Sequence, residues 1–170
     1  MTDPLVVTLL LDERSQAAFD ALRRRHFPPE RNLLAAHVTL FHALPGDEVA
    51  RVRDDLAAAA QAAAPYDVQV TGVRSLGRGV AYVLDSAELT AQRARLAQAW
   101  WTELTPQDRS GFSPHVTVQN KVAPDVARAL LADLRAAFSP YAVRARGLQL
   151  WHYRGGPWEP AGRWPYVAGG

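Results

Sequence analysis

Two histidine motifs carry the chemistry that this sequence offers. The triplet His37-Val38-Thr39 recurs as His115-Val116-Thr117, a shift of 78 positions. Side chains alternate faces along a strand, so each histidine shares a face with the threonine two positions later. Imidazole exchanges protons near neutral pH, and a hydroxyl can donate to a phosphoryl oxygen on which charge develops. The motifs therefore predict acid–base catalysis of phosphoryl transfer, with a histidine at each end of the reacting bond.

The residues that follow each motif are candidates for substrate contact. Strand alternation places Phe41 on the first open face and Gln119 at the equivalent point of the second. An aromatic ring in such a place can stack on an unpaired base, although filling of the core is the alternative use of Phe41. Lys121 follows the second strand within reach of a phosphate, with an exposed surface position as the alternative. We predict that all three contact substrate.

A metal site is the rival use of two histidines. Catalytic zinc commonly has three protein ligands. His42 is the nearest third candidate, but strand alternation directs it to the opposite face, and neither motif contains a carboxylate. We therefore expect chemistry that needs no metal and no cofactor. The tryptophans Trp151, Trp158 and Trp164 near the C-terminus are assigned to packing rather than to a nucleotide pocket.

The composition restricts the other functional classes. The 170 residues suffice for one domain with its own core. There is no cysteine, which excludes a disulfide framework, a thiol nucleophile and a thiolate metal site. The net charge is only +2 and no basic run occurs, so a long nucleic-acid duplex is not expected as a partner. No apolar stretch suits a signal peptide or a membrane span, and we expect a cytoplasmic monomer.

Alternating strands and helices must position the two motifs. Apolar periodicity and turn residues predict both kinds of element. The predicted strands are 5–11, 36–42, 66–76, 80–84, 115–119 and 141–153, the predicted helices are 12–26, 46–64, 87–104 and 124–138, and a polar loop spans 105–114. The segment after residue 153 lacks periodicity.

The two motifs belong to a longer internal repeat. Pro65-Tyr66 and Gly72 recur as Pro140-Tyr141 and Gly147, with a shift of 75. Both halves have the order strand, helix, histidine strand, helix, strand. We therefore predict one bilobal domain over residues 1–170, with a repeat at about 4–76 and 80–153. A pseudo-twofold axis between the lobes would bring both open faces to one cleft.

The motif pair resembles a known family. His37-Val38-Thr39-Leu40 and His115-Val116-Thr117-Val118 are similar to the paired motifs of the 2H phosphoesterase superfamily. The segments AAHVTLFHALP and SPHVTVQNK resemble its bacterial 2'-5' RNA ligase-like branch. The resemblance implies a bilobal α+β fold with antiparallel sheets facing a central cleft. It transfers catalytic roles to the histidine and threonine of each motif, with His115 as base and His37 as acid.

The resemblance also implies a reaction. Family members open 2',3'-cyclic phosphates to 2'-phosphates without a metal, and some join RNA ends through a 2'-5' linkage. The expected ligands are short RNA ends or cyclic-phosphate nucleotides. This chain departs from the family where His42-Ala43-Leu44 replaces a common Phe-Leu-Gly and where Asn120-Lys121 replaces a common Arg. The alternatives are a 2'-5' RNA ligase, or a protein that binds nucleotides or RNA ends with little turnover.

Overall fold

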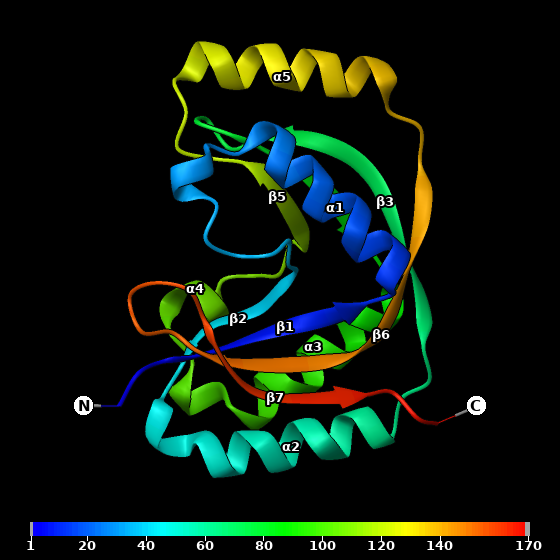
Figure 1. Cartoon of the computed structure of the whole chain (residues 1–170). Coiled ribbons are helices and arrows are strands. Elements are labelled where there is room, and N and C mark those ends of the chain that lie inside the picture. Colours follow the sequence, from blue (N-terminus) through cyan, green and yellow to red (C-terminus); the bar gives the residue numbers. More distant parts are fainter. Residues whose placement is uncertain (1, 169–170) are drawn as a thin grey trace.

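The polypeptide forms one curled antiparallel sheet with helices packed against it (Figure 1). The computed structural model describes residues 2–168, and within that range the sheet has seven strands. Six strands run in the order β2-β1-β6-β3-β4-β5, and β7 pairs with β6 beside this path. Every pairing between neighbours is antiparallel. The predicted α+β fold with antiparallel strands is confirmed.

The elements largely follow the apolar pattern of the sequence. The strands are β1 Leu5–Leu11, β2 Thr39–Leu44, β3 Tyr66–Ser75, β4 Val80–Asp85, β5 His115–Gln119, β6 Tyr141–His152 and β7 Glu159–Pro165. The helices are α1 Glu13–His26, α2 Val49–Gln61, α3 Ala87–Ala99, α4 Pro106–Arg109 and α5 Pro124–Ala137, with 3-10 turns at Pro29–Arg31, Gly46–Glu48 and Trp101–Glu103. Within residues 2–168, no helix combines the length and the apolar character that a membrane crossing requires.

The helices predicted over 46–64 and 87–104 end earlier, at Gln61 and Ala99, and three further differences concern the residues near the motifs and the tail. The second strand begins at Thr39 rather than at residue 36, so His37 lies just before it. The segment 105–114 is not all loop, because Thr105 caps the short helix α4 by accepting from the Asp108 N–H. The tail forms strand β7, which pairs with β6. Its sequence lacks the apolar alternation from which a strand could have been predicted.

Strand β6 joins the two ends of the sheet. Its residues 145–152 pair with β1, and its residues 141–145 pair with β3. Helix α2 packs on β6 and β7 at one end, while α1 packs on β5 and α5 on β3 and β4 at the other (Figure 1). The two facing sheets that we predicted are therefore the two ends of one continuous sheet. The motif strands β2 and β5 are the first and last strands of its order.

Glycine at position 79 allows β4 and β5 to come together at the end of the second motif. A Cβ atom on Gly79 would overlap the carbonyl oxygen of Gln119 and lie 2.7 Å from Cα of Asn120. We expect Gly79→Ala to lower the free energy of unfolding by about 1–3 kcal/mol, because the β5 backbone must move to admit the methyl group. Urea denaturation measures this. Gly72→Ala is the matched control, since no atom lies within 4 Å of its added Cβ. Equal losses in the two variants would contradict the argument.

Candidate active site

The two motif histidines are held in the same way, each by a backbone carbonyl two residues earlier. Nδ1 of His37 lies 2.8 Å from the carbonyl oxygen of Ala35, and Nδ1 of His115 lies 2.9 Å from that of Ser113. A carbonyl oxygen only accepts hydrogen bonds, so these contacts assign the hydrogen to Nδ1 in both rings. Each Nε2 is then the atom that can take up a proton and deliver it.

The motif threonines lie on the same open face as the histidines. Thr39 pairs with Thr8 of β1, and Thr117 pairs with Ala81 of β4. Both threonines and both histidines are half-buried. The residues that alternate with them are fully buried, namely Val38, Leu40, Val116 and Val118. The predicted alternation of faces therefore holds through each motif.

Each motif strand contains an extra residue directly after its threonine. On β2, Thr39 and Phe41 pair with consecutive residues of β1, so Leu40 is extra. On β5, Thr117 and Gln119 pair with consecutive residues of β4, so Val118 is extra. A bulge of this kind leaves one residue without a partner and re-aims the side chains that come after it. Both motif strands therefore lose their alternation at the same point.

The bulges overturn the predicted positions of Phe41 and Gln119. Both side chains are buried, with 0% and 4% exposure, rather than lying on the open face. The ring of Phe41 packs against Trp100 at a centroid distance of 5.0 Å, and the guanidinium of Arg93 covers it at 4.3 Å. Phe41 is therefore a core residue here and offers no surface on which a base could stack.

The same bulge corrects the prediction for His42. Strand alternation directed this side chain away from the motif face, but the extra residue returns it to that face, where 44% of the side chain is exposed. His42 lies five positions after His37. The residue five positions after His115 is Asn120, which lines the groove described below. The family resemblance marked both positions as departures, and the structure places both beside the motifs.

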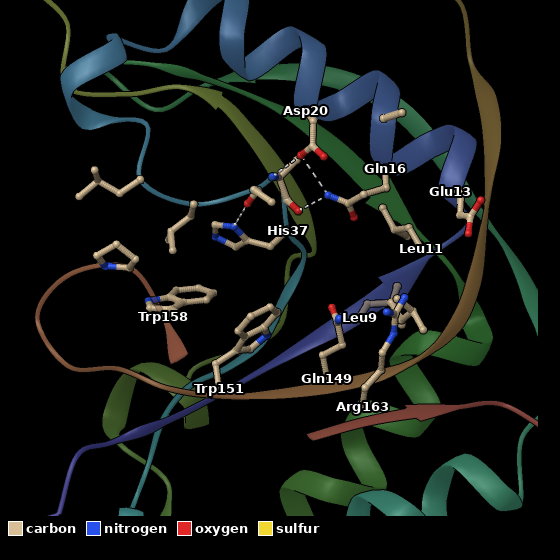
Figure 2. A pocket seen from close by; sticks show the side chains of 17 residues that line it. Leu9, Leu11, Glu13, Gln16, Asp20, His37, Gln149, Trp151, Trp158 and Arg163 are labelled. Atoms are coloured by element: carbon tan, nitrogen blue, oxygen red, sulfur yellow. Dashed lines mark hydrogen bonds between the residues drawn. The ribbon is translucent and has the colours of Figure 1, made fainter. Parts of the chain in front are cut away.

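Helix α1 holds the segment that leads into the first motif. The Ala36 N–H donates to Oδ1 of Asp20 at 2.7 Å, and Nε2 of Gln16 donates to the Ala36 carbonyl at 2.7 Å (Figure 2). Gln16 also donates to Asp20 at 3.1 Å. These contacts fix both polar groups of the residue before His37, although His37 itself lies outside regular strand structure.

A cavity of about 510 Å³ opens on one side of His37. Its walls come from α1, from residues 33–36 and from β1, β6 and the tail (Figure 2). The Trp158 ring lies 4.7 Å from the His37 ring between centroids, and Trp151 lies 6.2 Å beyond Trp158. Both tryptophans line this cavity, so their assignment to packing alone is corrected. Flat apolar walls beside a histidine suit an aromatic or otherwise apolar part of a substrate.

A second groove, of about 710 Å³, joins the two motifs and is rich in positive charge. His37 and Thr117 line it together with Lys121, as do the basic side chains of Arg23 and Arg31. NH1 of Arg23 donates to the Thr117 carbonyl at 2.9 Å, which ties α1 to the second motif strand. One carboxylate, that of Glu30, also lines it, so three cations face one anion and the groove favours an anionic ligand.

Burial and neighbouring charge act together on the imidazoles. Burial, partly offset by the Ala35 hydrogen bond, acts together with positive charge on Arg23, His115 and His42 to lower the pKa of His37 to about 4. Burial also lowers the pKa of His115 below 6.5, and Arg74 and His42 add to this. Both rings are therefore neutral at neutral pH, and a phosphate bound next to them would favour their protonation.

Arg74 is a cation that sequence reasoning missed. It pairs across the sheet with Ala81, which in turn pairs with Thr117, so the three residues form one row on the motif face. The small Ala81 leaves room for the arginine side chain above it. Nε of Arg74 is buried and has no hydrogen-bond partner within residues 2–168. Only strand register could have found this residue, because 43 positions separate Arg74 from Thr117 in the sequence.

Comparisons with known proteins identify the family of this chain and the structures that share its fold. The family model of the 2'-5' RNA ligase superfamily matches residues 11–157. The chain belongs to this superfamily. No curated protein sequence matches the chain. The recognition of a 2H phosphoesterase from its paired motifs is thereby confirmed.

Solved structures share the whole fold at low sequence identity. TT0787 of Thermus thermophilus has a TM-score of 0.64 at 16% identity, with 96% of this chain and 97% of that chain covered. E. coli LigT complexed with 3'-AMP has a TM-score of 0.61 at 20% identity, with 98% and 99% covered. E. coli LigT complexed with NADP+ has a TM-score of 0.59 at 17% identity, with 97% and 98% covered. These likenesses concern the fold.

Removal of the indole that covers His37 tests the origin of its low pKa. We expect Trp158→Ala to raise the pKa of His37 from about 4 toward 6.5, because burial is the largest cause of the shift. A pH titration of the histidine Cε1 protons by NMR measures this. Trp101→Ala is the matched control, because that indole is 49% exposed and packs against Arg109. An unchanged His37 titration in Trp158→Ala would show that the indole does not cause the shift.

Proposed function

We propose that this protein is a metal-independent phosphoesterase that opens 2',3'-cyclic phosphates of RNA ends or nucleotides to 2'-phosphates. Membership of the 2'-5' RNA ligase superfamily supports phosphoesterase or ligase chemistry in general. The observation that carries the finer proposal is the matched pair of imidazoles. Each has Nδ1 tied to a carbonyl and leaves Nε2 available, and His37 lines a cationic groove together with Thr117 of the second motif.

In the proposed step the two imidazoles act on opposite sides of the phosphorus atom. Nε2 of His115 accepts a proton from water as the water oxygen bonds to phosphorus. The bond from phosphorus to ribose O3' breaks, its electron pair goes to O3', and that oxygen takes a proton from Nε2 of His37. The product has a 2'-phosphate and a free 3'-hydroxyl. The hydroxyls of Thr39 and Thr117 donate to the non-bridging oxygens, where negative charge is greatest.

The electrostatics of the cleft couple protonation to substrate binding. The low pKa values make both histidines neutral at neutral pH, which suits a base but not an acid. A phosphate between the rings brings the negative charge that stabilises one imidazolium. The acid is therefore ready only when the substrate is bound. Because both rings have the same kind of Nδ1 contact, the assignment of His115 as base and His37 as acid rests on the family resemblance.

The surroundings support a nucleotide or RNA end as the substrate. The cationic groove accounts for phosphate, and the cavity with Trp151 and Trp158 accounts for a base or another flat group. Lys121 lines the groove, and we propose that it contacts a phosphate. E. coli LigT has been crystallised with 3'-AMP, NADP+ and ATP, which are all nucleotides. The same class of ligand fits this groove.

Hydrolysis of 2',3'-cyclic nucleotides in excess EDTA tests the proposal. We expect wild type to form the 2'-phosphate, and His37→Ala and His115→Ala each to lower kcat by about 10²–10⁴-fold, the usual worth of general acid–base catalysis. His26→Ala is the matched control, because that histidine ends α1 and lines neither the cavity nor the groove. Turnover that survives both motif substitutions would refute the mechanism. No turnover by wild type would favour a nucleotide-binding protein.

The pH dependence of kcat/KM assigns the two roles. Activity falls at low pH when the base is protonated and at high pH when the acid is deprotonated. In His115→Ala we expect the residual activity no longer to fall at low pH. In His37→Ala we expect it no longer to fall at high pH. The reverse result would exchange the two roles, and unchanged limbs in both variants would exclude both histidines from proton transfer.

Ligation is the second candidate, and the family description favours it. A 5'-hydroxyl would replace water as the nucleophile and form a 2'-5' linkage when the same P–O3' bond breaks. The same two histidines would serve. Addition of RNA with a 5'-hydroxyl end to the hydrolysis assay distinguishes the reactions, because ligation gives a longer product in place of the 2'-phosphate.

A further inference from the structure

A third histidine, His42, follows the first motif on β2, and a buried carboxylate fixes its orientation. Nδ1 of His42 lies 3.0 Å from Oδ1 of Asp108 on α4. Asp108 is 1% exposed and also accepts from the backbone N–H groups of His42 and Ala43, at 3.0 and 3.2 Å. Burial alone would raise the pKa of Asp108, but these hydrogen bonds outweigh it and hold the pKa below its usual value. The carboxylate is therefore ionised at neutral pH.

The scaffold around this pair is rigid. Arg93 of α3 donates from Nε to the Leu40 carbonyl at 3.1 Å and from NH2 to the Asp108 carbonyl at 2.7 Å. One arginine thus ties the bulge of β2 to the helix that carries the carboxylate. Thr105 caps that helix from the other side. The position of the imidazole is therefore set by three elements rather than by its own rotamer alone.

His42 differs from the motif histidines in the partner of its Nδ1. A carbonyl orients His37 and His115, whereas a carboxylate orients His42. An ionised carboxylate stabilises the imidazolium that forms when Nε2 takes up a proton. A cationic donor of this kind suits binding of an anion better than proton abstraction from water.

The location of His42 fits that role. The bulge places it on the face that carries His37 and Thr39, and the corresponding residue of the second motif, Asn120, lines the cationic groove. Positive charge on His42 lowers the pKa of both His37 and His115, so His42 lies within electrostatic reach of both. The charged and titratable groups around it are Asp108 on α4, Arg93 on α3, His37 before β2 and His115 on β5.

We propose that His42, oriented by Asp108, is a substrate-binding residue that donates from Nε2 to a non-bridging phosphoryl oxygen. This inference rests on the proposed function, since it concerns the phosphate that the motif histidines act on. His42 takes no part in the proton transfers to and from the reacting oxygens. Asp108 is a positioning residue, because it acts through the imidazole.

Binding of inorganic phosphate, followed by calorimetry at about pH 6 where imidazole is readily protonated, tests the proposal. We expect His42→Gln to weaken phosphate binding about 10–100-fold, in line with loss of a charge-assisted hydrogen bond. Asp108→Asn keeps acceptor oxygen for the backbone N–H groups but removes the charge, and we expect a loss of about 3–10-fold. His26→Gln is the matched control and should bind phosphate as wild type does.

Kinetics with a 2',3'-cyclic nucleotide separates binding from a structural role. We expect His42→Gln to raise KM by a factor similar to its loss of phosphate affinity, while kcat falls by less than in His37→Ala or His115→Ala, since no proton transfer is removed. A variant with wild-type phosphate affinity and wild-type KM would overturn the inference. If wild type turns over no cyclic phosphate but phosphate binding still depends on His42, the proposed function fails and the anion site stands.

A measurement on wild type covers the case in which His42→Gln does not fold. The Cε1 protons of the five histidines are followed by NMR during addition of phosphate. The signals of the four histidines other than His42 are assigned through single substitutions, and the remaining signal is that of His42. We expect the His42 signal to shift together with those of His37 and His115. A His42 signal that stays in place while the other two move would refute the contact.

Discussion

The pairing of β6 with both β1 and β3 is the constraint on which the rest of the structure depends. Residues 145–152 of this strand belong to one end of the sheet and residues 141–145 to the other. Because antiparallel strands twist steadily relative to one another, a continuous sheet of this length curls. The curl brings His37, just before β2, and Thr117 of β5 to a common groove, although β2 and β5 are farthest apart in the strand order.

The groove that results is electrostatically unfavourable for protonated histidine until an anion arrives. Arg23, Arg31 and Lys121 line it, and Arg74 stands in the same row as Thr117. Burial is the largest cause that lowers the pKa of His37 to about 4, and the charge of Arg23 adds to it. A phosphate reverses the balance, since it contributes negative charge where the cations converge. The same cations that favour phosphate binding therefore help to keep the histidines neutral until phosphate is bound.

The two ends of the site are similar in backbone but differ in their side chains. Both histidines have a carbonyl contact, and both strands have a bulge after the threonine. Beyond that point His42 with its carboxylate stands on one side and Asn120 on the other. Trp158 covers His37, whereas the cation that acts on His115 is Arg74. A near-symmetric pair of imidazoles therefore has asymmetric surroundings, which an asymmetric substrate requires.

The sequence by itself determined the α+β fold, the superfamily and the alternation of His37, Val38, Thr39 and Leu40, because these depend on local periodicity and on two spaced motifs. It did not determine the side-chain directions beyond each threonine, because a bulge depends on how many residues the neighbouring strand advances. For that reason Phe41 and Gln119 were expected on the open face and are buried, while His42 was expected on the opposite face and is exposed. The tertiary structure alone brought Asp108, Arg74 and Arg23 to the motifs, since each comes from a distant segment and reaches the site through sheet register, a buried hydrogen bond or helix packing.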